Sequence, residues 1–163
     1  MVYEATLAYN EPLIRRAVLS FWRRSVGVGF FVAILLEAGA LAVLLAAGDR
    51  SWWVGMLGTV LVGGVALAGA VYVIHYANAI RKFKEMGPLL ASFRAEESTF
   101  TLASEIGTAT FRWAAVKEVW RFTDYWLILF SKAQFVTVPI AGLSPEMQTF
   151  VLERVDAAGG KIS

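Results

Sequence analysis

The side chains that could carry chemistry are few in this sequence. It contains one histidine, His75, and no cysteine, which excludes thiolate chemistry, disulfides and cysteine-type metal sites. Nucleophilic catalysis needs a base within hydrogen-bond reach of the nucleophile. His75 lies at the end of a long apolar stretch, and we interpret it as a polar residue of a membrane interface instead of a catalytic base. No glycine-rich phosphate loop precedes a helix. We therefore predict a protein that is not an enzyme, with no metal, no cofactor and no identifiable small-molecule substrate.

Glu37 is the chemically unusual residue, because it stands in the middle of the apolar stretch from Val26 to Ala47. A lone carboxylate is strongly disfavoured in hydrocarbon, so we expect Glu37 to be neutral and hydrogen bonded. In an antiparallel helix pair it would lie level with Gly63 and Gly64, whose missing side chains leave room for a carboxyl group. Backbone carbonyls, Thr59 or a helix of another subunit could be its partner. A structural hydrogen bond, a subunit contact and proton translocation all stay open as its role.

A second group of candidates is basic and could contact lipid headgroups or a partner protein. Its members are Arg94, Arg112, Lys117, Arg121 and Lys132. A basic side chain beside an anionic membrane contributes about 1 kcal/mol. After position 75, however, ten Lys and Arg stand against nine Asp and Glu, and we favour a solvated surface for these bases. The same balance argues against nucleic acid as a partner.

Two membrane-crossing helices must position Glu37 and His75. The apolar stretches at 26–47 and 52–75 have about 22 residues each, against the roughly 20 that a helix needs to cross a bilayer. Apolar stretches of this length predict helices, because a helix forms its backbone hydrogen bonds internally and needs no water inside the lipid. Only Gly48–Ser51 separates them. The hydrophobic fraction of 58% and the mean hydropathy of +0.60 agree with a membrane protein.

The basic residues that flank these stretches predict their orientation. Seven of them, Arg15, Arg16, Arg23, Arg24, Arg81, Lys82 and Lys84, lie outside the hairpin, whereas the connecting turn carries only Arg50. The positive-inside rule then places both termini in the cytoplasm. The first 25 residues are too polar for a cleavable signal peptide. We predict a multi-pass protein of the cytoplasmic membrane.

The amino-terminal flank, residues 1–25, contains a short strand at 2–9 and an amphipathic helix capped by Asn10. The apolar stripe of that helix could lie on anionic lipid or pack on a cytosolic domain, and we favour packing. The hairpin occupies residues 26–76. A cytosolic helical extension follows at 77–87 and ends at Gly87–Pro88.

The last segment, residues 88–163, predicts a small cytosolic domain. Its short runs rich in Thr, Val and aromatic residues, at 90–95, 99–104, 107–113, 116–122, 125–130 and 135–138, predict one antiparallel sheet. A helix from Pro145 to Ala157 closes it, with Phe150 and Val151 facing the sheet. Three tryptophans, Trp113, Trp120 and Trp126, could line a pocket, but we interpret them as core. Whether Trp120 or Arg121 faces inward is not decided by the pattern. The fold class is an α+β membrane protein with a domain resembling a pleckstrin-homology-like half-barrel.

Three segments resemble the YcxB-like family of small bacterial membrane proteins. They are the Trp-centred strand at 111–119, the following strand at 125–130 and the run at 136–139 into a proline. The resemblance implies paired membrane helices, a pleckstrin-homology-like carboxyl-terminal domain and the bacterial inner membrane, and it carries no biochemical activity. The family often has a basic residue soon after that proline, whereas Ile140, Ala141 and Gly142 follow here.

Two functions remain. The first is a docking or scaffold module, in which the cytosolic domain binds a protein or a lipid headgroup. The second is an oligomeric, transport-related membrane subunit that uses Glu37 between its helices. Expected partners are membrane lipid and either a second copy of the chain or another membrane protein.

Overall fold

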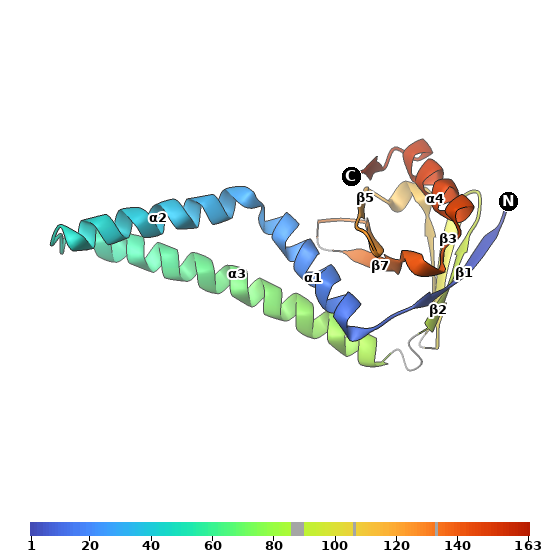
Figure 1. Cartoon of the computed structure of the whole chain (residues 1–163), viewed down its shortest axis with the longest axis horizontal. Helices are drawn as coiled ribbons and strands as arrows, with labels where there is room; N and C mark the ends of the chain where they lie inside the picture. Colours follow the sequence, from blue (N-terminus) through green and yellow to red (C-terminus); the bar gives the residue numbers. More distant parts are fainter. Residues whose placement is uncertain (86–89, 106, 133) are drawn as a thin grey trace. The chain divides into compact units, whose positions relative to one another are not determined.

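The computed structural model describes residues 1–85, 90–105, 107–132 and 134–163. The chain forms two compact units, Met1–Ala17 with Ala79–Ser163 and, separately, Val18–Asn78. The first unit contains the sheets and the second contains the helical hairpin (Figure 1). The long helices are α1 (Glu11–Val26), α2 (Val28–Ala46), α3 (Trp52–Glu85) and α4 (Pro145–Ala157). The protein is therefore α+β, with two long apolar helices and mainly antiparallel sheets.

Among the described residues, eight strands form two four-stranded sheets instead of the single sheet predicted. The strands are β1 (Tyr3–Ala8), β2 (Leu90–Ala95), β3 (Thr99–Ser104), β4 (Gly107–Arg112), β5 (Glu118–Arg121), β6 (Tyr125–Leu129), β7 (Phe135–Pro139) and β8 (Lys161–Ile162). The first sheet has the order β1-β2-β3-β4 and the second β7-β6-β5-β8. All neighbours are antiparallel except β5 and β8, which are parallel.

Trp113 separates the two sheets, which is why the single-sheet prediction is wrong. The predicted strand at 107–113 ends at Arg112, and Trp113 starts a short 3₁₀ helix, η1 (Trp113–Ala115). Its indole is buried, 4.7 Å from the Phe100 ring, and its Nε1 donates to the Glu96 carbonyl at 2.8 Å. This non-local packing turns the chain from one sheet to the other.

The amino-terminal strand β1 belongs to the first sheet. It pairs with β2 from Tyr3–Ala95 to Ala8–Leu90. Leu7 and Phe93 are both fully buried. About 80 residues of sequence therefore separate two neighbouring strands, and the whole hairpin is inserted between them.

Helix α4 has the predicted bounds and the predicted buried face. The Ser144 hydroxyl accepts from the Met147 N–H at 3.2 Å, and Pro145 stands in the first turn. Phe150 and Val151 are buried in the core between the sheets and the helix. Trp113, Trp120 and Trp126 are buried too, and Arg121 is exposed, which settles the register of β5.

The hairpin differs from its prediction at both ends. Gly27, with φ of 80°, separates α1 from α2, so the first apolar helix starts at Val28 and has 19 residues. The second continues without a break through the predicted extension to Glu85 and has 34 residues. The predicted stop at Gly87–Pro88 lies outside the described residues. Length and composition alone make both helices candidates for membrane spans.

Candidate functional site

One face of α2 packs on α3, and Glu37 lies on that face. The partly buried residues of α2 recur every three or four positions and are Phe30, Ile34, Glu37, Ala38, Leu41 and Leu44. A Cβ added at Gly64 would lie 3.6 Å from Ile34 Cδ1, and one at Gly58 would lie 3.9 Å from Leu41 Cδ2. These two contacts define an antiparallel helix pair (Figure 1).

Neither Gly63 nor Gly64 opens a space beside Glu37. Gly64 faces Ile34, and a Cβ at Gly63 would have no neighbour within 4 Å. Ile34 lies opposite Gly64, and Leu41 lies opposite Gly58. By interpolation along the two antiparallel helices, Glu37 is at the same height as Leu61. The Thr59 hydroxyl donates to the Gly55 carbonyl of its own helix at 2.9 Å, a common alternative for threonine within a helix. Glu37 forms no hydrogen bond or ion pair with another of the residues that the structure describes.

His75 lies among aromatic side chains of the hairpin unit. Its ring is 5.7 Å from that of Phe21, in an edge-on arrangement. Nearby, the Trp22 Nε1 donates to the Ala68 carbonyl at 2.9 Å, and the Trp22 ring is 5.7 Å from that of Tyr72. Among the described residues, no group of three His, Asp or Glu side chains is placed to hold a metal ion.

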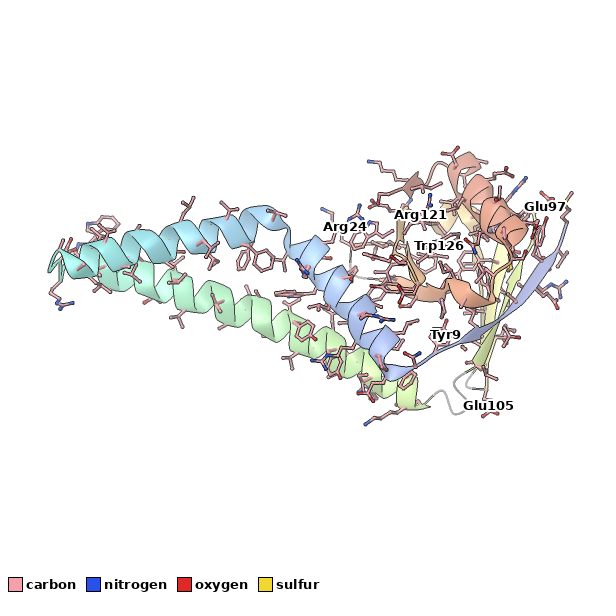
Figure 2. All side chains as sticks on the ribbon, viewed as in Figure 1. Tyr9, Arg24, Glu97, Glu105, Arg121 and Trp126 are labelled. Atoms are coloured by element: carbon pink, nitrogen blue, oxygen red, sulfur yellow. The ribbon has the colours of Figure 1, made fainter. Side chains whose placement is uncertain are left out.

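The candidate bases are all exposed, but they do not form one cluster. Arg94 is engaged by Glu96 at 2.8 Å and by Glu4 at 3.5 Å. Arg112 ends β4 in the first sheet. Lys117 and Arg121 flank the opposite ends of β5, about 13 Å apart at the rise of an extended strand. Lys132 follows β6. Figure 2 shows Arg121 and Glu105 on different parts of this unit.

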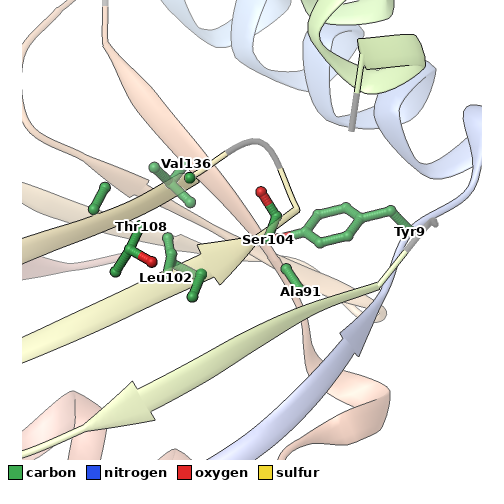
Figure 3. Close-up of a pocket in the computed structure, with 9 residues that line it drawn as sticks. Tyr9, Ala91, Leu102, Ser104, Thr108 and Val136 are labelled. Atoms are coloured by element: carbon green, nitrogen blue, oxygen red, sulfur yellow. The ribbon is translucent and has the colours of Figure 1, made fainter. Parts of the chain in front are cut away.

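The described residues of the two-sheet unit contain a pocket of about 380 Å³ that sequence reasoning missed. Strand ends that are distant in sequence build it: Tyr9 follows β1, Ser104 ends β3, Gly107 starts β4 and Val136 lies near the start of β7 (Figure 3). The full lining is Tyr9, Ala91, Leu102, Ala103, Ser104, Gly107, Thr108, Ala109 and Val136.

Small residues leave this space open. Along the inward-facing rows of the first sheet, Phe93, Phe100 and Phe111 fill the core, whereas Ala91 and Ala109 occupy the corresponding positions in the pocket. Their two-residue spacing from the phenylalanines keeps them on the same face of the strand. A switch from phenylalanine to alanine along one row was the only signal in the sequence.

The chemistry of the pocket is that of apolar binding. None of the described residues that line it is charged, and the polar side-chain groups among them are the hydroxyls of Tyr9, Ser104 and Thr108. The Tyr9 hydroxyl donates to the Thr137 carbonyl at 2.8 Å. Burial raises the pKa of Tyr9 well above its usual range, so this donor keeps its proton at neutral pH. Such a lining can hold uncharged groups.

Comparison with known proteins agrees with the family suggested by the sequence. Residues 96–153 match the family model described as YcxB-like protein. This segment runs from the end of β2 into α4 and contains the sequence segments that resemble the family, among them residues 111–119 and 125–130. It covers less than half of the chain. No curated protein and no solved structure matches the chain.

Proposed function

We propose that this chain, whose residues 96–153 match the YcxB-like family model, is a non-enzymatic integral protein of the bacterial cytoplasmic membrane. In this proposal α2 and α3 cross the membrane, and both termini are cytoplasmic. The two-sheet unit is a pleckstrin-homology-like module that docks a partner. Two features support it. The apolar stretches of α2 and α3 are not buried inside the protein. In the other unit, two sheets pack with a carboxyl-terminal helix around one core.

The uncharged pocket carries the docking function and favours a protein partner. A lipid headgroup would need basic side chains around its phosphate, and the described part of the lining contains none. The candidate bases lie on other parts of the unit. An apolar side chain of a polypeptide fits a space of this size and lining. We therefore assign the partner as an uncharged protein segment that inserts one or two apolar side chains.

The transport alternative has less support. A transport pathway needs several polar groups inside the membrane. The described face of α2 that packs on α3 carries Glu37 as its one charged residue, beside Ile34 and Leu41. The docking function therefore explains more of the molecule.

Blocking the pocket is expected to abolish docking. Ala109→Trp places a large side chain in the pocket at an exposed position, so the sheets should still fold. We expect the amount of partner captured from native membranes to fall at least roughly tenfold. The tryptophan and the partner's side chain would compete for one space, and forcing extra volume into a filled space costs about 1–3 kcal/mol. Ser92→Trp, on the exposed outer face of β2, is the matched control.

A photo-crosslinking residue at position 109 identifies the partner class. The expected result is a protein adduct that does not form from position 92. Adducts with lipid alone would contradict the assignment of a protein partner, and equal capture by both tryptophan variants would contradict the pocket as the site.

The membrane part of the proposal makes a separate prediction. The natural chain has no cysteine, so single cysteines report on topology without background. Ser51→Cys, in the turn between α2 and α3, should react with an impermeant thiol reagent in intact cells. Ser163→Cys should react only after the membrane is permeabilised. The reverse pattern would show the opposite orientation, and reaction of both in intact cells would rule out a cytoplasmic carboxyl terminus.

A further inference from the structure

Edge strands expose backbone groups that can pair with another strand, and most edges of this unit are covered. The β1 edge lies against the 3₁₀ helix η2 (Ile140–Gly142), where a Cβ at Gly142 would overlap the Thr6 carbonyl oxygen. The Tyr9 hydroxyl bonds the Thr137 carbonyl of β7. The carboxyl-terminal β8 covers β5: the Ser163 N–H donates to the Val119 carbonyl at 3.0 Å.

Strand β4 is different, because only β3 pairs with it among the described strands. The Trp113 N–H donates to the Ser98 carbonyl at 3.3 Å, in continuation of the β3–β4 register. Antiparallel pairing alternates residue by residue. Positions 107, 109 and 111 therefore direct their backbone groups toward β3, and positions 108, 110 and 112 direct theirs outward.

The central part of the outward edge of β4, residues 108–110, has none of the features that block strand addition. Thr108, Ala109 and Thr110 are exposed and uncharged. The strand contains no proline and shows a continuous register with β3. Threonine favours extended structure. The outward backbone groups of Thr108 and Thr110 therefore present a template for another strand.

Opposite charges stand at the two ends of this edge. Glu105 precedes β4, and Arg112 ends it. Both side chains are exposed, and no ion pair joins either of them to a residue that the structure describes. A strand with an acid before one end and a base at the other complements itself only when two copies run antiparallel, because each end then meets the opposite charge.

We propose that β4 is a dimerisation strand, which pairs antiparallel with β4 of a second copy of this chain. With the two Thr110 residues opposite each other, outward-facing residues pair along the whole edge. Thr108 of one copy is opposite Arg112 of the other, so Arg112 lies at the same end of the contact as Glu105 of the other copy. The contact is isologous, so the same patch serves both subunits. It joins the two first sheets into one continuous eight-stranded sheet.

A proline placed at an outward N–H tests this pairing. Thr108→Pro removes a donor that points away from β3, a position where an edge strand tolerates proline. Thr108→Ala keeps the donor and is the matched control. In the detergent-solubilised full chain, we expect Thr108→Pro to raise the dimer dissociation constant at least about tenfold, because the two-fold contact loses two hydrogen bonds. Thr108→Ala should stay within about threefold of the natural chain.

Charge-reversal variants and single-cysteine variants test the register of the pairing and the identity of the partner. Arg112→Glu and Glu105→Arg should each weaken the dimer, and their combination should restore it. Thr110→Cys should form a disulfide-linked dimer under mild oxidation, since paired Cα atoms at this site are about 5.5 Å apart. Ser92→Cys, on the outer face of β2, should not.

The proposal fails if the chain is monomeric at all accessible concentrations. It also fails if Thr108→Pro and Thr108→Ala dimerise equally, or if Thr110→Cys crosslinks mainly to a different protein. A common melting temperature for the two Thr108 variants separates lost pairing from lost folding.

Discussion

Replacing Phe150 with alanine is expected to lower the free energy of unfolding of the two-sheet unit by about 3–5 kcal/mol. The side chain is 6% exposed, and its ring lies 5.0 Å from that of Tyr3 in β1. The Arg154 guanidinium carbon lies 5.1 Å from the ring centre on the same helix. Truncation therefore removes contacts that join α4 to the amino-terminal strand and leaves a cavity. For a domain of this size the loss is a large share of the total stability.

Chemical denaturation of the detergent-solubilised chain, followed by tryptophan fluorescence, measures this effect. Trp113 and Trp126 are in the same core and report its unfolding. Glu153→Ala, an exposed change on the same helix, should leave the midpoint within the range of ordinary surface substitutions, about 0.5 kcal/mol. An unchanged midpoint for Phe150→Ala would mean that α4 does not pack on the sheets as described.

Gly142→Ala is expected to destabilise the same unit by about 3 kcal/mol, the upper end of the usual cost of overpacking. A methyl group there would overlap the Thr6 carbonyl oxygen of β1. The overlapping atom belongs to the backbone, so no rotamer change relieves it. Either η2 or β1 must move, and hydrogen bonds between β1 and β2 should weaken.

Hydrogen exchange identifies which element moves. We expect faster exchange at the Leu7 amide, which lies next to Thr6 and opposite Ala91 in the β1–β2 pair, together with a lower melting temperature. Ala141→Ser changes the exposed neighbour and should alter neither. If Gly142→Ala matched that control in both measurements, the close approach of η2 to β1 would be excluded.

Local physics made the helices and most strand boundaries predictable from the sequence. Asn10 was expected to cap α1, and its side chain accepts from the Leu13 N–H at 2.8 Å. Ser144 and Pro145 marked the start of α4 for the same reason. Strands β2 and β3 have the predicted bounds, because polar turns separate short, β-prone runs. In each case the signal and its effect lie within a few residues of each other.

The division of the strands into two sheets was decided only by tertiary structure. Trp113 leaves the extended path because its indole finds a partner in Glu96 and a neighbour in Phe100. The two-residue strand β8 exists because β5 supplies an edge for it. Trp120 is buried on a strand whose pattern fits both registers equally well. Such choices depend on which side chains meet across the core, and these contacts join residues distant in sequence.

The candidate sites show the same division between local signals, which the sequence contains, and contacts between distant residues, which it does not. The sequence alone identified Glu37 as a charge in an apolar helix and the bases as exposed residues, since both judgements need only composition and spacing. It could not place Gly64 against Ile34, because helix rotation depends on how side chains pack between α2 and α3. Nor could it reveal the pocket, which forms where Tyr9, Gly107 and Val136 converge from three strands. The empty space is a property of packing, and no short segment contains it.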